Sequence, residues 1–94
     1  MNRLEVKLTH QSFREAGGIE AFSDLEIAGI VVVDLVNNLS NFQLNKKNVD
    51  KEINDKASDM GATHVFGIEY KYRLNISKEE TIAGAIGTAY KPRI

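Results

Sequence analysis

The two histidines, His10 and His64, are the side chains of this chain best suited to binding a metal ion. Imidazole is a common ligand of zinc and other transition metals, but protein sites combine it with two or three further ligands. Asp59 and Glu69 lie within five residues of His64, yet neither histidine belongs to an HxH, HxxxH or histidine–aspartate cluster. We therefore interpret both histidines as polar residues at the ends of elements and keep His64 as the candidate metal ligand. The sequence identifies no cofactor.

Side chains that could catalyse a reaction are present but are not grouped in a catalytic pattern. The carboxylates between residues 50 and 59 alternate with lysine and asparagine, which is typical of a solvated helix face rather than of a general acid–base pair. The serines lie outside any nucleophile-elbow motif. Residues 84–87 fall inside an apolar strand-like run, whereas a phosphate-binding loop joins a strand to a helix. We identify no catalytic residue and expect a protein that is not an enzyme.

Lys71 and Arg73 alternate with Tyr70 and Tyr72, as basic and aromatic residues do in proteins that bind single-stranded nucleic acid. Successive side chains of a strand point to opposite faces, however, so these tyrosines would lie opposite the basic residues. The net charge of −1 also provides no broad basic surface. We interpret the tyrosines as core residues with hydroxyls at the rim and expect no nucleic-acid partner.

Length and composition indicate one ordinary globular domain covering residues 1–94. The chain contains no cysteine, which excludes disulfides and thiolate metal sites. No apolar run approaches the roughly 20 residues that span a bilayer, and residues 1–7 do not resemble a signal peptide. We therefore expect a cytoplasmic protein with no membrane partner.

The C-terminal third has the clearest structural pattern, because apolar and polar residues alternate from residue 64 to residue 76. This period predicts a long strand with one buried and one wet face. The face predicted to be buried carries Phe66, Ile68, Tyr70, Tyr72, Leu74 and Ile76. The face predicted to be wet carries Val65, Gly67, Glu69, Lys71, Arg73 and Asn75. A polar loop of about four residues at 77–80 would then lead into an antiparallel strand over 81–90.

The predicted strand over 81–90 has apolar residues on both faces. One face consists of alanine and glycine, which would let a helix approach closely. The other carries Ile82, Ile86, Thr88 and Tyr90. A strand with two apolar faces is usually covered on both sides. A neighbouring subunit or the N-terminal segment of the same chain could supply the second cover, and the sequence leaves both alternatives open.

The remaining elements supply the cover for these two strands. Residues 2–9 alternate as a short strand, and Gly17-Gly18 interrupts regular structure after it. Residues 27–36 combine β-branched composition with helical spacing; we expect a strand over 25–30 and a helix over 31–42. A second helix is predicted from Val49 to Met60, capped by Asn48 and ended by Gly61. Its apolar stripe contains Val49, Ile53, Ala57 and Met60. The predicted fold is α+β, an antiparallel sheet of three to four strands with two helices packed on one face.

The stretch KASDMGATHVFGIEYKYRL, followed by ETIAGAIGTAYKP, resembles the C-terminal signature of the YbjQ-like family of small bacterial and archaeal proteins. That family has a long helix, a Gly-Ala-x-x-Val strand and a last strand closing on Gly-Thr-Ala. The matching pieces here are Gly61 to Val65 and Gly87 to Ala89. Residues 33–41 resemble the first family helix without its two arginines, which favours helix in that segment.

The resemblance implies an α+β domain of a homo-oligomer, a ring-like pentamer, with a heavy-metal-binding label and no established activity. Together with the strand that has two apolar faces, it suggests an oligomeric, non-enzymatic protein that binds a metal or small ligand where subunits meet. The alternative is a structural or adaptor domain whose exposed face recognises another protein.

Overall fold

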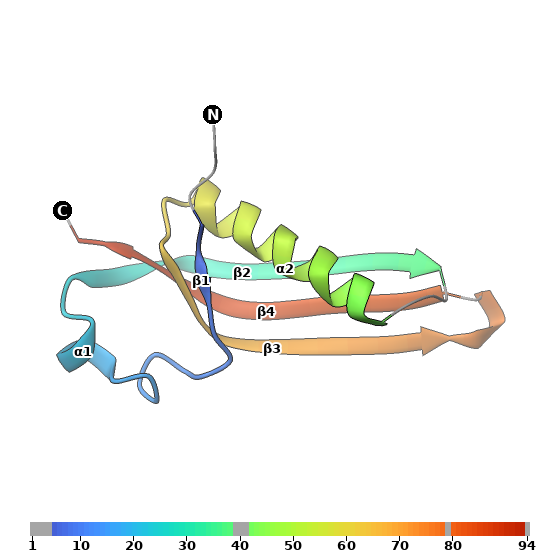
Figure 1. Ribbon diagram of the computed structural model, residues 1–94, viewed down its shortest axis with the longest axis horizontal. Helices are drawn as coiled ribbons and strands as arrows, with labels where there is room; N and C mark the ends of the chain where they lie inside the picture. The colour runs from blue at the N-terminus through green and yellow to red at the C-terminus, as the bar shows by residue number, and fades with distance from the viewer. Residues whose placement is uncertain (1–4, 39–41, 79, 94) are drawn as a thin grey trace.

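The computed structural model describes residues 5–38, 42–78 and 80–93. Its elements, in chain order, are β1 (Lys7–Leu8), α1 (Gly18–Ala21), β2 (Leu25–Asn38), α2 (Phe42–Asp59), β3 (His64–Asn75), the 3-10 turn η1 (Ile76–Lys78) and β4 (Glu80–Pro92). The four strands form one sheet in the order β1-β3-β4-β2, and α2 lies across one of its faces (Figure 1). β1 runs parallel to β3 and the other pairs are antiparallel. The predicted α+β class, a mostly antiparallel sheet with two helices, is confirmed.

No helix within the described ranges is both long enough and apolar enough to cross a membrane.

The helix predicted for residues 31–42 is wrong, because β2 continues as one strand from Leu25 to Asn38. It pairs with β4 from Leu25 opposite Pro92 to Asn38 opposite Glu80, with one extra residue, Ala28, between the pairs of Ile27 and Gly29. β-branched side chains lose rotamer freedom in a helix but pack well on a pleated sheet, and residues 30–33 are all β-branched. Burial alternates accordingly: Val31 and Val33 are buried, and their neighbours on the strand are exposed.

Helix α2 begins at Phe42, several residues before the predicted start. Asn48 therefore lies inside the helix, so the prediction that it caps the N-terminus is wrong. The predicted stripe is confirmed for Val49, Ile53 and Ala57, which are buried against the sheet, while Met60 is partly exposed beyond the last turn.

The predicted glycine end of α2 is confirmed, because Gly61 adopts a φ of 77°. Its amide donates to the Ser58 carbonyl, and the Ala62 amide donates to the Ala57 carbonyl. These are the two bonds of a Schellman motif, which satisfies the last free carbonyls of a helix. The chain thus turns directly from α2 into β3.

A one-residue bulge divides β3 in two. Phe66 pairs with Thr88 and Glu69 pairs with Ile86, so Gly67 and Ile68 together face Gly87 of β4. Gly67 has a φ of 67°, the left-handed conformation that glycine adopts without steric penalty. The extra residue reverses the alternation, because side chains two apart on a strand share a face only where the pairing is regular.

The bulge corrects the predicted faces of β3. Val65, predicted to be wet, is buried under α2 together with Ile68 and the partly buried Tyr70. Phe66 is also buried, but it lies on the opposite face, where it contacts aromatic side chains from other segments. Tyr72 (37% exposed) and Leu74 (54% exposed), farther along the strand, are exposed rather than buried. Sequence alternation across residues 64–76 could not reveal an inserted residue.

The segment after β1 binds the free amides of the bulge. Gly67 N–H donates to the Gln11 carbonyl at 2.7 Å, and Ile68 N–H donates to the Thr9 carbonyl at 3.1 Å. Buried backbone N–H groups need hydrogen-bond acceptors, so these two bonds compensate Gly67 and Ile68 for the hydrogen bonds to β4 that the bulge interrupts. The predicted strand 2–9 is reduced to Lys7–Leu8 within the described residues, since residues 1–4 lie outside them.

Gly87 gives the bulge room on the α2 side of the sheet. A Cβ at this position would lie 2.7 Å from Val65 Cγ1 and 3.1 Å from Ile68 Cγ1. Both side chains crowd the same residue because the bulge has turned them to the same face. The alanine and glycine face predicted for β4 is therefore the face that α2 covers, and Ala83, Ala85 and Ala89 are buried there.

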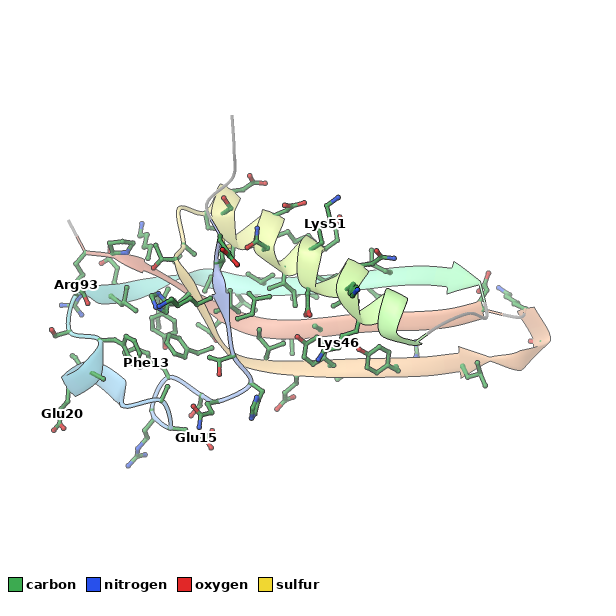
Figure 2. The ribbon with its side chains drawn as sticks, in the orientation of Figure 1. Phe13, Glu15, Glu20, Lys46, Lys51 and Arg93 are labelled. Carbon is green, nitrogen blue, oxygen red and sulfur yellow. The ribbon has the colours of Figure 1, made fainter. Side chains whose placement is uncertain are left out.

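Replacing Ile53 by aspartate tests the packing of α2. The Ile53→Asp variant should lose about 3 kcal/mol or more of unfolding free energy, because it places a carboxylate among buried apolar side chains. Lys51→Asp is the matched control, since Lys51 points away from the sheet (Figure 2) and should change stability by less than about 0.5 kcal/mol. Urea unfolding curves measure both. Equal stability of the two variants would show that α2 does not cover the sheet.

Replacing Gly87 by alanine tests the crowding at the bulge. Gly87→Ala should lose about 1–3 kcal/mol, because its methyl group overlaps Val65. In a Val65→Ala background the same replacement should lose less, since the overlapping methyl group is gone. A double-mutant cycle from chemical denaturation measures the difference, and equal losses in the two backgrounds would contradict this packing.

Candidate functional site: the open face of the sheet

The face of the sheet opposite α2 is the candidate functional surface, which we call the open face. Its centre carries Ile30 (63% exposed) and Val32 (54% exposed) from β2, and Ile86 (41% exposed) from β4. Val32 and Ile86 are direct partners in the pairing of the two strands, so their side chains lie next to each other. Contiguous exposed apolar side chains on a sheet mark a surface that usually contacts another molecule.

Charged side chains border the apolar centre of the open face. Lys71 on β3 and Asp34 on β2 both pair with Gly84 of β4, so the three residues form one row across the sheet. Glu69 and Arg73 flank Lys71 on the same face of β3 and are exposed. Because Gly84 has no side chain, the surface is hollowed between Lys71 and Asp34. A cavity of about 770 Å³ opens at this end of the sheet, with Val32, Asp34, Lys71, Arg73, Ile82 and Ile86 among its lining residues.

The other end of the open face is covered on the β3 side by residues 9–22, which we call the N-terminal lobe. Phe13 of the lobe stacks on Tyr90, with ring centroids 4.4 Å apart, and its ring edge meets Phe66 at 5.4 Å (Figure 2). Phe22 contacts Phe66 and His64. The sequence allowed either a neighbouring subunit or the N-terminal segment to cover the second face of the strand predicted over 81–90. The N-terminal lobe covers that face, but only at this end of the sheet.

Side-chain bonds fix the first turn of the lobe. The Ser12 hydroxyl accepts from the Glu15 amide, and the Glu15 carboxylate accepts from the Ser12 amide, which is the reciprocal pattern of a capping box. The bonds to Ser12 lower the pKa of Glu15. Gly17 and Gly18 follow with positive φ, and Gly18 is the first residue of α1.

The candidate ligand His64 lies in the aromatic cluster of Phe13, Phe22, His64, Phe66 and Tyr90. Its ring is parallel to that of Phe66 at 5.7 Å, and its Nδ1 is 2.8 Å from the Thr63 hydroxyl. Burial lowers the pKa of His64, and Lys7 lowers it further against the opposing effect of Asp24.

Within the described residues, no three histidine, aspartate or glutamate side chains are grouped as a metal site. The structure places Glu69, one of the two carboxylates near His64 in sequence, beyond the bulge of β3. Metal binding at His64 stays a prediction. His10 is exposed at the start of the lobe, outside the ring contacts of the aromatic cluster.

The tyrosines of β3 lie on the α2 side, opposite Lys71 and Arg73. The Tyr70 hydroxyl donates a 2.5 Å hydrogen bond to Asp50 of α2, and the Lys46 ammonium lies 5.4 Å from the Tyr70 ring centroid. Burial and the Asp50 carboxylate raise the pKa of Tyr70. Tyr70 therefore joins α2 to β3, as its interpretation as a core residue with a rim hydroxyl predicts.

Sequence reasoning placed Ile86 on an apolar face without a cover but missed the β2 half of this surface. Val32 and Asp34 were assigned to a helix, which separated them from the strand they belong to. The signal was available in the β-branched run from Ile30 to Val33, because such runs favour strands over helices.

Comparison with known proteins gives a likeness in fold. No protein-family model matches the sequence, and no curated protein matches it. Among solved structures, the chain is similar to a crystal structure of a protein of unknown function from the DUF74 family of Pediococcus pentosaceus. The TM-score is 0.58 at 16% identity, covering 93% of this chain and 97% of that chain. At this identity the likeness shows the fold alone.

Titration of His64 should make the fold sensitive to acid. Its pKa is lowered in the folded chain, so the unfolded chain binds more protons below the ordinary value of 6.5, and unfolding free energy should fall as the pH drops through this value. His64→Phe keeps an aromatic ring and should show a shallower dependence between pH 7 and pH 5 in urea unfolding. His10→Phe removes the other histidine, which lies outside the aromatic cluster, and serves as the comparison. A His64→Phe slope equal to that of the wild type would contradict the burial of His64.

Proposed function

We propose that this chain is a non-enzymatic binding protein that works as a homo-oligomer, with its copies meeting on the open face of the sheet. The observation that carries the proposal is the exposed apolar centre formed by Ile30, Val32 and Ile86. At roughly 25 cal/mol per Å² of apolar surface removed from water, covering such side chains favours association.

The open face is better suited to contact another copy of the chain than the free edge of β2. Lys56 of α2 donates a 2.8 Å hydrogen bond to the Val32 carbonyl. A lysine ammonium at the edge of a sheet hinders the addition of another strand, because the incoming backbone must displace it. The open face has no such obstacle at its centre.

The shared fold with a DUF74 protein supports the family resemblance, since DUF74 and YbjQ-like are names of one family. That resemblance implies a ring of five copies and a heavy-metal ligand. A second copy over the open face would also close the cavity beside Lys71, Arg73 and Asp34, which makes the subunit contact the place where a metal or small ligand would bind.

An adaptor that presents the open face to a different protein is the second candidate. The same exposed side chains favour it, and the state of the purified chain separates the two. Self-association indicates the homo-oligomer, whereas a monomer that binds another protein through Val32 and Ile86 indicates the adaptor.

Replacing Val32 by glutamate tests the proposed contact. Light scattering of the wild type should give a mass that is a multiple of 10.5 kDa, while Val32→Glu should shift the protein to single chains because it places a carboxylate in the apolar centre. Leu74→Glu is the matched control: Leu74 is equally exposed but lies on the α2 side of β3, and its replacement should leave the mass unchanged. A wild type that stays monomeric at high concentration would reject the homo-oligomer.

A further inference from the structure

The cavity on the open face has a floor without a side chain and two walls of opposite charge. Its floor includes Gly84 of β4, which pairs with Lys71 of β3 on one side and with Asp34 of β2 on the other. One carboxylate oxygen of Asp34, Oδ1, lies 3.5 Å from the position that a Cβ at Gly84 would occupy. The Asp34 carboxylate is therefore directed over the floor of the cavity rather than away from it.

The basic wall of the cavity consists of two cationic side chains. Lys71 and Arg73 are two residues apart on β3, so both project from the open face, and both line the cavity. Within the described part of the chain, neither of them makes an ion pair or a side-chain hydrogen bond, and the same holds for Asp34. Adjacent strands lie about 4.8 Å apart, so the backbones of Lys71 and Asp34 are roughly 10 Å apart across β4. This separation leaves space for a ligand between the two charges.

The two ends of the cavity are apolar. Ile82 and Ile86 lie two residues before and after Gly84 on β4, so their side chains project from the same face, and Val32 pairs with Ile86. Val32 and Ile86 are both exposed in the single chain. A ligand in the cavity therefore meets apolar side chains at its ends and opposite charges on its two sides.

This combination suits a zwitterion better than a metal ion or a simple anion. The two cations of the basic wall would repel a metal ion, and the described residues contain no group of three histidine, aspartate or glutamate side chains. A simple anion would face the Asp34 carboxylate without a cation to offset it. An α-amino acid satisfies both walls, because its carboxylate accepts hydrogen bonds from Lys71 and Arg73 while its ammonium donates to Asp34.

We propose that this cavity binds a free α-amino acid with an apolar side chain, which packs against Ile82, Ile86 and Val32. The inference rests on the proposed function, which puts a small ligand in this cavity, and adds the chemical class of that ligand. The cavity volume of about 770 Å³ lies within the range of small-molecule sites, about 300–1,000 Å³. A second copy over the open face would exclude water from the cavity, which strengthens the attraction between the ligand and both walls.

The experiment follows the backbone amide signals of the full chain by nuclear magnetic resonance during titration with L-leucine and two blocked analogues. N-acetyl-L-leucine keeps the carboxylate and lacks the ammonium, whereas L-leucinamide keeps the ammonium and lacks the carboxylate. Leucine should shift the signal of Gly84 and leave that of Gly18 in the N-terminal lobe unchanged. Each analogue should bind about tenfold more weakly or worse, because a charged hydrogen bond is lost and its protein partner is left unpaired.

Two variants test the two walls separately. Lys71→Met should weaken leucine binding and bring its affinity close to that of leucinamide, while Asp34→Asn should bring it close to that of N-acetyl-leucine. Lys51→Met and Glu20→Gln are the matched controls, since they remove the same charges from α2 and α1, away from the cavity (Figure 2), and should bind leucine as the wild type does. Thermal unfolding verifies that each variant is folded, and the comparison of analogues on the wild type needs no variant.

A preference of the wild type for leucine over both analogues that is lost in the two variants supports the site. The site is overturned by an unchanged Gly84 signal up to the solubility limit of leucine, by equal binding of leucine and either analogue, or by wild-type affinity in both variants.

Light scattering of the same samples separates this inference from the proposed function. An oligomer that does not bind leucine overturns the amino-acid site and leaves the homo-oligomer in place. A monomer that binds leucine in preference to both analogues supports the site and rejects the homo-oligomer.

Discussion

The extra residue at Gly67 is the constraint on which the rest of this structure depends. A regular strand would send Val65 and Ile68 to opposite faces, and one of these two apolar side chains would be lost from the core under α2. The left-handed backbone at Gly67 brings both to the same face, while Phe66 between them turns to the other. The amides freed from the ladder then need acceptors, and Thr9 and Gln11 supply them. The N-terminal lobe is thereby held against the side of the sheet to which Phe66 points.

This division gives the two ends of the sheet different covers on the side away from α2. At the bulge end, Phe13 and Phe22 surround Phe66 and His64. Past the bulge, β3 presents Glu69, Lys71 and Arg73 on that side, and the chain supplies no described segment to cover Val32 and Ile86 beside them. The α2 side is filled by contrast, because alanines on β4 let the helix approach closely. The proposed contact between copies follows from this imbalance: one face is packed within the chain, and the other retains apolar surface with balanced charge.

Much of this fold could be predicted from sequence, because residues 64–76 and 81–90 alternate strongly and Gly61 ends an amphipathic helix. The faces of β3 could not, since an inserted residue changes which side chains share a face without changing their order. The length of β2 was missed because Val32, Leu35 and Val36 also fit helical spacing, and only pairing with β4 decides between the two. As a result half of the open face, including Asp34, was assigned to a helix. The sequence placed His64 correctly at the start of β3, but its aromatic surroundings include Phe13 and Phe22, more than 40 residues earlier in the chain.

The most direct test of this account is the pattern of nuclear Overhauser effects at Gly87 in the folded protein. With the bulge in place, the side chains of Val65 and Ile68 both lie against Gly87, so its Hα protons should show strong effects to the methyl groups of both residues. A regular β3 would place only one of the two on the α2 face beside Gly87. Effects to Val65 or to Ile68 alone would show that β3 contains no bulge, and would remove the basis for the two faces described above.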